Sequence, residues 1–185
     1  ENEGYAFRPH SLTVSWEEVG PREGTLRAFL GSYASYSGGA HPNLQFNMLN
    51  WDEGLGEEIG FADLFEDEDA ARTVMADALQ TALIEAKRER LNDDSLTDAQ
   101  LMDTWLRAAF ENNDAIFENF TVARGIDSEV PAGLVYRFEP YTVGAYAEGP
   151  YEVIVPAAVF IDELAPRYDE LFDPTVEIAQ SAPAP

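Results

Sequence analysis

The chain has 185 residues, with 35 Asp and Glu against 11 Lys and Arg, which gives a formal net charge of -24. This charge argues against a nucleic-acid-binding protein, which needs a clustered basic face, and against adsorption to anionic lipid. Hydrophobic residues make up 45% and aromatic residues 12%, which is typical of a folded chain rather than of a disordered one. The length suffices for one buried core.

The chain contains no cysteine, so disulfide bonds, thiolate nucleophiles and the common structural zinc sites are excluded. No run of residues approaches the roughly 20 apolar positions of a membrane helix, so we expect no direct membrane insertion of this segment. The sequence begins at Glu1 rather than at Met. We therefore expect any signal peptide, lipid anchor or membrane helix to lie upstream of it.

The first third of the chain predicts strands. Apolar and polar residues alternate over 12–16, the pattern of a half-buried strand. A turn is expected at 20–24, an extended segment at 25–33, and a further alternating strand at 44–48. The short connections between these segments favour antiparallel pairing.

The middle of the chain predicts helices. Apolar residues recur at helical spacing over 74–86, and residues 91–94 are expected to end that helix. Thr97 and Gln100 then have the spacing of a capping box, with an apolar helical segment behind them at 101–110. We expect the two helices to form a hairpin that covers one face of the sheet.

Strands return in the last third, where candidates lie at 116–123, 134–138 and 151–155, before a short helix at 160–164. A helical block between two groups of strands predicts an α+β fold, in which a helical hairpin is inserted between N-terminal and C-terminal strands and covers an antiparallel sheet. The small, proline-rich end of the chain predicts a flexible tail over 173–185.

A glycine pair followed by a histidine is the first distinctive segment. Gly38 and Gly39 permit a positive φ or the close approach of another backbone, and Tyr36 precedes them. His41 is a candidate proton donor, metal ligand or loop-pinning side chain. A lone histidine more often has the last of these roles.

Tyrosines among glycine turns form the second distinctive segment, over 138–150. If exposed, Tyr141 and Tyr146 offer a contact surface for a glycan or a protein, because aromatic rings bury a large area at low entropy cost. The alternative is that both rings pack in the core and hold the sheet to the helices.

Catalytic and metal-binding motifs are weak. A Ser-His-Asp triad would need His10 or His41 as its base, and no Gly-x-Ser-x-Gly motif is present. Carboxylates are dense over 57–69 and 93–98, where they suit either calcium or, more simply, the start of a helix. A pair of catalytic carboxylates, as in a glycosidase, is a further alternative, because the distance between two such groups depends on the fold and is not visible in the sequence.

The two distinctive segments together resemble a bacterial extracytoplasmic family classed as a domain of unknown function. This family occurs in RsiV-type anti-sigma factors and beside the catalytic domain of some peptidoglycan deacetylases. The resemblance covers roughly residues 25 to 165. The residues that carry it are the aromatic strand from Tyr33 to Tyr36, Gly38-Gly39-Ala40-His41, the strand from Leu44 to Trp51, Asp52-Glu53-Gly54, Asp63-Leu64-Phe65, Phe138, Pro140-Tyr141-Thr142-Val143, Tyr146-Ala147-Glu148-Gly149, and the strand from Val153 to Pro156.

The resemblance implies an α+β domain outside the cytoplasm, in the periplasm or at the cell surface, over residues 25–172. Residues 1–24 would then be the remnant of an N-terminal companion region. In RsiV-type members the domain looks like a sensor that binds lysozyme, although no sigma-binding segment or membrane helix is visible in this chain. The family has no accepted catalytic residues, so none is transferred.

We therefore predict a non-enzymatic binding or sensor domain without a cofactor. The predicted partner is a cationic protein such as lysozyme, which an acidic surface would attract. The alternatives are a cell-wall glycan-binding accessory domain that takes peptidoglycan fragments, and a hydrolase that uses His41. A simpler view is that the acidity only keeps the domain soluble. The candidate ligand-binding residues are Tyr36, Gly38, Gly39, His41, Tyr141 and Tyr146.

Overall fold

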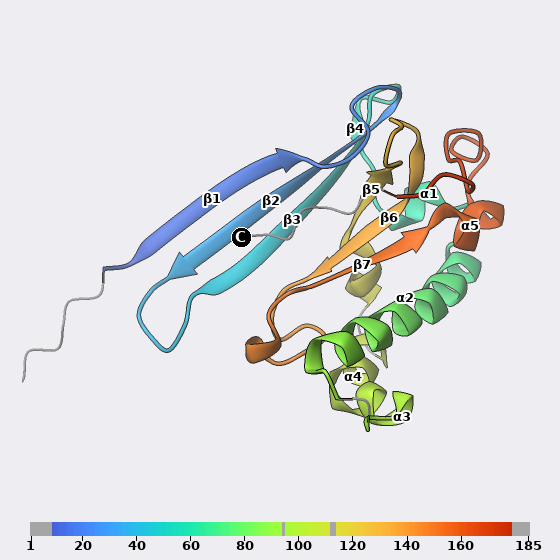
Figure 1. Cartoon of the computed structure of the whole chain (residues 1–185). Coiled ribbons are helices and arrows are strands. Elements are labelled where there is room, and N and C mark those ends of the chain that lie inside the picture. Colours follow the sequence, from blue (N-terminus) through green and yellow to red (C-terminus); the bar gives the residue numbers. More distant parts are fainter. Residues whose placement is uncertain (1–8, 94, 112–113, 179–185) are drawn as a thin grey trace, which may run out of the picture.

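The chain folds as an α+β protein whose strands form two antiparallel sheets (Figure 1). The computed structural model describes residues 9–178 apart from 94 and 112–113. This agrees with the fold class predicted from the sequence, with the strands divided between a four-stranded and a three-stranded sheet. In chain order the strands are β1 (Ser11–Glu18), β2 (Leu26–Tyr36), β3 (Asn43–Asp52), β4 (Glu57–Glu58), β5 (Phe120–Arg124), β6 (Pro131–Phe138) and β7 (Tyr151–Pro156).

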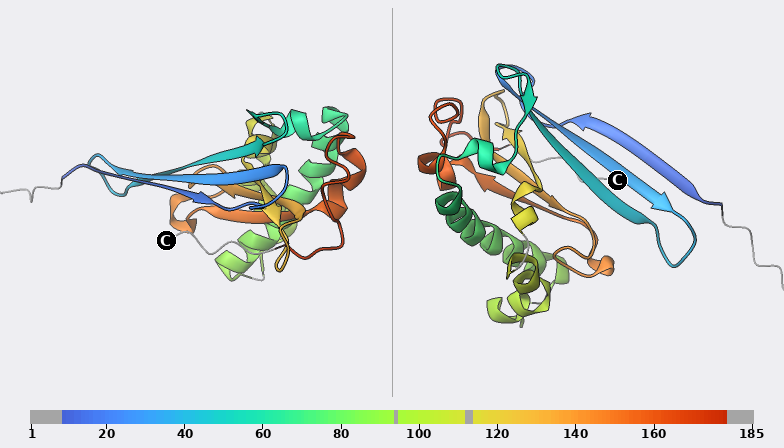
Figure 2. Two further views of the ribbon diagram at one scale, coloured as in Figure 1. Left: turned by 90° about the horizontal axis from the view of Figure 1, so that it is seen from above. Right: turned by 180° about the vertical axis from the view of Figure 1, so that it is seen from behind.

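The first sheet has the order β1-β2-β3-β4, and its neighbouring strands are antiparallel, as the short predicted connections favoured. β1 pairs with β2 without interruption from Ser11↔Tyr36 to Glu18↔Phe29, and β2 pairs with β3 over almost its whole length. These three long strands project away from the helices (Figures 1 and 2). We call β1, β2, β3 and the hairpin loop 37–42 the β arm.

The outer strand of the β arm is less buried than its sequence predicts. β1 is a strand, as expected, but Leu12, Val14 and Trp16 are 68%, 46% and 49% exposed. The half-buried prediction was therefore wrong at this strand. These side chains lie on the same face as Tyr33 of β2, whereas the buried Leu26 and Ala28 alternate onto the opposite face, toward the core.

The second sheet has the order β5-β6-β7, and its central strand β6 is buried on both faces. Leu134, Tyr136 and Phe138 point into the main core. On the other face Arg137 is 3% exposed, with its guanidinium 2.8 Å from the Glu152 carboxylate and 2.8 Å from the Thr121 hydroxyl.

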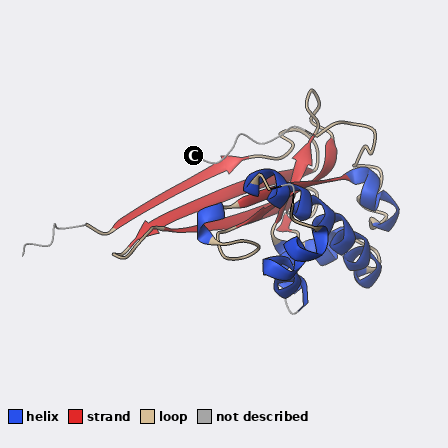
Figure 3. Cartoon of the chain, turned by 60° about the horizontal axis from the view of Figure 1, so that its bottom comes forward, coloured by secondary structure: helices blue, strands red, loops and turns tan. Residues whose placement is uncertain are grey.

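The long helix α2 (Glu68–Leu91) packs along the core face of the second sheet, next to β7. Its buried residues recur every four positions, from Ala71 to Lys87. The Asp67 carboxylate caps its start, and Asn92, in the left-handed conformation, ends it, so the predicted helix end is confirmed. The other helical segments are short, and most gather with α2 on one side of the strands (Figure 3). They are α1 (Phe61–Leu64), α3 (Asp98–Leu101), η1 (Met102–Leu106), α4 (Arg107–Glu111), η2 (Asp114–Glu118), η3 (Tyr146–Glu148), α5 (Ala157–Phe160) and η4 (Ile161–Glu163).

The second arm of the predicted helical hairpin begins with the capping box of Thr97 and Gln100, as expected, and packs against α2. It is not one regular helix, because a π-helical segment, η1, separates α3 from α4. The next difference is at 114–118, which forms a 3-10 helix where the sequence suggested the start of a strand. Ile116 and Phe117 are both buried in this 3-10 turn, and the strand β5 begins only at Phe120.

The buried side chain of Asn50 links the two sheets by hydrogen bonds. Asn50 on β3 is 4% exposed; its Nδ2 donates to the Phe120 carbonyl at 3.0 Å, and its Oδ1 accepts from the Val122 N–H at 2.8 Å. The Asn50 amide thus hydrogen-bonds to the edge of β5 as a neighbouring strand would. This junction fixes the β arm relative to the helical body.

The end of the described chain packs against the second sheet. The Ile126 N–H donates to the Glu177 carbonyl at 2.9 Å, and Ile178 forms a bridge with Gly125. Residues 173–178, expected to belong to a flexible tail, are thus in contact with the body, and the proline-rich residues 180–185 lie outside the described residues. Among residues 9–178, apart from 94 and 112–113, no helix has the length and apolar character needed to span a membrane.

Candidate ligand-binding site

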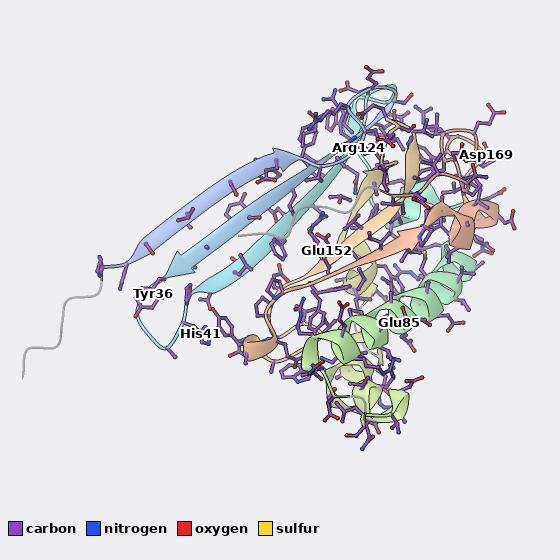
Figure 4. The ribbon with its side chains drawn as sticks, in the orientation of Figure 1. Tyr36, His41, Glu85, Arg124, Glu152 and Asp169 are labelled. Atoms are coloured by element: carbon purple, nitrogen blue, oxygen red, sulfur yellow. The ribbon has the colours of Figure 1, made fainter. Side chains whose placement is uncertain are left out.

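The two distinctive segments of the sequence meet in space. The tip of the β arm lies beside the loop 139–150, which joins β6 to β7 (Figures 1 and 4). The His41 ring stacks on the Tyr146 ring, with their centroids 3.5 Å apart and an interplanar angle of 18°. The Tyr146 hydroxyl donates to the Pro42 carbonyl at 3.0 Å. Residues about a hundred positions apart therefore form one surface.

Two further rings extend this contact. Tyr141 is 53% exposed; its hydroxyl lies 3.2 Å from His41 Nε2, and its ring centroid lies 5.8 Å from that of Tyr146. The Trp105 ring, on the π-helical segment η1, lies 6.2 Å from Tyr141. We call His41, Trp105, Tyr141 and Tyr146 the aromatic cluster. It combines rings from three separate parts of the chain.

Tyr141 has a backbone conformation that is uncommon for a residue with a side chain. Its φ is 78°, in the left-handed region that favours glycine. The Tyr141 N–H donates to the Gly144 carbonyl at 2.9 Å, which closes the tight turn that holds it. A strained backbone that presents an exposed ring is more typical of a functional position than of a structural one.

The remaining predicted residues shape the tip. Gly38 and Gly39 have φ values of 94° and 127°, and a Cβ at either position would meet no atom within 4 Å. Their glycine identity is therefore required by the turn, not by a crowded neighbour. The Tyr36 hydroxyl donates to the Gly39 carbonyl at 3.1 Å and closes the tip.

The loop opposite the tip is held by the only lysine of the chain. Lys87 is 1% exposed, and its Nζ donates to the Val143 carbonyl at 2.9 Å and to Glu148 Oε2 at 2.6 Å. The Glu148 carboxylate also accepts from the Tyr151 hydroxyl at 2.5 Å and from the Ala145 N–H at 2.8 Å. Lys87 thus links α2 to the turn that carries Tyr146.

These contacts shift the pKa values of Glu148 and Tyr151. Burial alone would raise the pKa of Glu148, but hydrogen bonds from Lys87, Tyr151 and Ala145 outweigh burial and lower it. Burial and the adjacent Glu148 carboxylate raise the pKa of Tyr151. The carboxylate therefore stays ionised and paired.

The start of the same loop is tied to the β arm. Glu139 Oε1 accepts from the Phe46 N–H of β3 at 2.9 Å. Together with the Tyr146–Pro42 hydrogen bond, this contact connects loop and arm at two points. The aromatic cluster is thus supported from α2 on one side and from β3 on the other.

Both ring nitrogens of His41 lie within hydrogen-bonding distance of other groups of the chain. Its Nδ1 lies 3.1 Å from the Pro42 carbonyl, and its Nε2 faces the Tyr141 hydroxyl. Within the described part of the chain neither nitrogen has a carboxylate partner of the kind that orients a general base. The geometry is that of a histidine that fixes a loop.

The acidic clusters have structural contacts. Asp67 Oδ1 accepts from the Asp69 and Ala70 N–H groups at 3.1 Å each, as expected of a helix start. Asp63 Oδ2 accepts from the Gly60 N–H at 2.8 Å. No group of three or more His, Asp or Glu that could hold a metal ion occurs among the described residues.

Asp52, the last residue of β3, is fully buried at the other end of the sheet from the tip. Its oxygens accept from the Gly54 and Leu55 N–H groups, from the Arg167 guanidinium at 2.8 and 3.2 Å and from the Tyr168 hydroxyl at 3.2 Å. The hydrogen bond from Arg167 is the main reason that the pKa of Asp52 is lowered, against the effect of burial. This turn docks the C-terminal segment and does not join the candidate site.

Sequence reasoning missed two parts of the site. Trp105 lies in the apolar helical segment expected at 101–110, and Lys87 directly follows the apolar stripe of 74–86, but neither was predicted as a site residue. The lysine did carry a signal, because a single Lys within the apolar stripe of α2 needs a buried partner. Nothing local marks Trp105, because its role comes from the packing of η1 near Tyr141.

A family model and two solved structures match this chain. A family model described as a protein of unknown function, DUF3298, matches residues 62–158. A crystal structure of a DUF3298 family member from Bacteroides fragilis aligns with a TM-score of 0.63 and 19% identity, over 91% of this chain and 59% of that one. A DUF3298 family protein from Pseudomonas aeruginosa aligns with a TM-score of 0.55 and 18% identity, over 85% of this chain and 63% of that one.

The chain therefore spans less than two-thirds of the length of either solved structure. A search of curated proteins finds no match. At these identities the two crystal structures show a shared fold.

Proposed function

The chain belongs to the DUF3298 family, whose function is unknown, and we propose that it is a non-enzymatic binding or sensor domain. The observation that carries this proposal is the aromatic cluster, in which the exposed Tyr141 lies beside His41, Tyr146 and Trp105. Exposed aromatic rings held by a rigid scaffold bury a large contact area and lose little conformational entropy. The β-arm tip adds Tyr, Ser, Gly and Asn, the residue types that dominate antibody contact loops.

The partner that we propose is a cationic protein, with lysozyme as the candidate. The net charge of -24 supports this choice, since an acidic protein attracts a basic one over long distances and speeds their association. The tip itself is nearly uncharged, so the acidic body would steer the partner while the rings make the contact. The sequence resemblance to the sensor domain of RsiV-type anti-sigma factors supports the same partner and a place of action in the periplasm or at the cell surface.

The test is a calorimetric titration of the chain with a basic lysozyme at low and at moderate salt. We expect binding that weakens as salt screens the charges. Tyr141→Gly removes the exposed ring and relieves the positive φ, so it should keep the fold and weaken binding about tenfold or more, which corresponds to about 1.4 kcal/mol. Leu55→Ala is the matched control, because Leu55 is 47% exposed but lies in the turn after β3, at the other end of the sheet.

A cell-wall glycan is the second candidate ligand, and the exposed Tyr141 ring favours it, because sugar rings stack on aromatic side chains. An uncharged peptidoglycan fragment should bind with an affinity that does not change with salt, and should alter tyrosine or tryptophan fluorescence. Salt dependence therefore separates the two candidates. If neither ligand binds the wild-type chain, or if Tyr141→Gly and Leu55→Ala bind equally well, the proposed site is wrong.

A further inference from the structure

Most of the β arm is free of charged side chains, although the protein is strongly acidic. Residues 28–51 contain no Asp, Glu, Lys or Arg, and neither do residues 11–16. Apart from the ends of its strands, the arm therefore carries no formal charge, while the whole chain carries -24. A surface without charge can approach another uncharged surface without direct repulsion between facing charges.

β1 forms an open edge of the arm. It is the last strand in the order β1-β2-β3-β4, and no strand pairs with its outer side among the residues that the structure describes. Natural edge strands are normally protected by charges, prolines, bulges or a short length. β1 has eight residues, a continuous register with β2, no proline, and no charge before Glu17.

The same strand exposes an apolar strip. Leu12, Val14 and Trp16 are 68%, 46% and 49% exposed and lie on one face. The Trp16 ring packs edge-on against Tyr33, with the centroids 6.3 Å apart, so its orientation is fixed. An open ladder edge next to ordered apolar side chains is the surface that adds a further strand.

We propose that a second copy of the chain pairs with this edge, β1 against β1 in antiparallel orientation, about a two-fold axis at Val14. In this register Val14 lies opposite Val14 of the second copy, and Leu12 lies opposite Trp16. Cross-strand partners share a face, so the two apolar strips become continuous. The interface is isologous, and the two β arms form one sheet.

Charge and shape favour a second copy over another occupant. A cationic partner would be drawn to the acidic body and would gain nothing from a neutral edge. β1 is uncharged from Ser11 to Trp16, and its apolar residues match in the antiparallel register. Because the arm projects from the helices, pairing at its outer edge leaves the two acidic bodies apart (Figure 2). This proposal does not depend on the identity of the ligand at the aromatic cluster.

Sedimentation velocity over a range of protein concentrations tests the proposal. A single-strand contact is small, and small interfaces are weak, so the mass should rise from 20.5 kDa toward twice that value only at the higher concentrations. Added salt should strengthen the dimer, because it screens the repulsion between two chains of net charge -24. A wild-type chain that stays monomeric at every concentration and salt level overturns the proposal.

Two lysine variants locate the interface. Val14→Lys places two like charges directly opposite each other and should abolish dimerisation, whereas Thr13→Lys adds the same charge on the same exposed strand but opposite Ser15 and should weaken it far less. Mixing Val14→Lys with Val14→Glu should restore a dimer, since opposite charges then face each other. Equal effects of Val14→Lys and Thr13→Lys, or no rescue by mixing, would exclude the proposed register. Circular dichroism checks that each variant remains folded.

A cross-link gives an independent readout, because the chain has no cysteine of its own. Directly opposed residues of antiparallel strands have Cα atoms about 4.5–5.5 Å apart, within the range of a disulfide. Oxidised Val14→Cys should therefore run as a reducible dimer, and Ser11→Cys, which lies away from the axis, should not. A dimer formed equally by both variants would indicate random collision and contradict the pairing.

Discussion

Replacement of the buried Lys87 by Met should destabilise the protein strongly. Lys87 Nζ has two partners, the Val143 carbonyl and the Glu148 carboxylate, and the two charged side chains are 1% and 14% exposed. Methionine has a similar shape but no charge, so Lys87→Met leaves the Glu148 carboxylate buried without its cation. The loop that carries Tyr141 and Tyr146 loses its link to α2.

The magnitude follows from what remains around the carboxylate. Removal of one partner of a buried ion pair costs about 3–5 kcal/mol. Glu148 retains hydrogen bonds from the Tyr151 hydroxyl and the Ala145 N–H, so we expect the lower end of that range, about 3 kcal/mol. For a chain of this length, this corresponds to a fall in Tm of roughly 6–12 °C.

Urea unfolding followed by tryptophan fluorescence measures this change. Arg88→Met is the matched control: Arg88 is on the same helix and pairs with Asp98, but the two side chains are 34% and 74% exposed, so we expect a loss of less than about 1 kcal/mol. The double variant Lys87→Met with Glu148→Gln removes the unpaired charge and should recover at least half of the lost stability.

The ion pair also predicts how stability changes with pH. The folded-state pKa of Glu148 is lowered, so its contribution to stability is complete above the unfolded-state value of about 4.3 and is lost as the pH falls through the folded-state value. The difference between wild type and Lys87→Met should therefore shrink below about pH 4. A Lys87→Met loss as small as that of Arg88→Met, or a double variant no more stable than the single one, would refute this reasoning.

Three further changes test other parts of the structure. Asn50→Ala leaves the Phe120 carbonyl and the Val122 N–H unpaired and should cost about 2–4 kcal/mol in urea unfolding, whereas Asn47→Ala, exposed on the same strand, should change stability by less than about 0.5 kcal/mol. Asp52→Asn should lower stability at pH 7 by roughly 2–3 kcal/mol and, because the pKa of Asp52 is lowered in the folded state, flatten the wild-type loss of stability below about pH 4. Gly144→Ala places a Cβ 2.8 Å from both the Glu148 carboxylate and the Tyr151 ring and should lower Tm, with a loss of about 1–3 kcal/mol; an unchanged Tm would show that the loop adapts.

Local patterns predicted most elements because each has a local cause. The alternation at 44–48 and 151–155 defines strands through the two-residue repeat of side-chain direction, and the stripe in 74–86 defines a helix through its period. Capping also acts within a few residues, so the start at Thr97 was predicted correctly. The strand predicted over 116–123 was wrong at 116–118, which belong to a 3-10 helix, and its local sequence does not distinguish the two conformations.

The candidate site was predicted in its parts but not in its assembly. The glycine turn before His41 and the tyrosines of 141–146 stand out in the sequence because glycine and aromatic residues have distinctive backbone and surface properties. The stack of His41 on Tyr146 joins residues more than a hundred positions apart, and no local rule determines such a contact. The addition of Trp105 depends in turn on the helical segment η1.

The sequence by itself determined the acidity, the absence of thiol chemistry, the α+β class and the turn conformations, because these follow from composition and from interactions between near neighbours. The tertiary structure decided which apolar residues are buried. Leu12, Val14 and Trp16 have the same alternation as a buried strand but stay exposed, because the core lies on the other face of their sheet. The tertiary structure also brings the tip of the β arm to the 139–150 loop. Asn50 ties the arm to β5, Glu139 ties the loop to β3, and Lys87 ties the loop to α2.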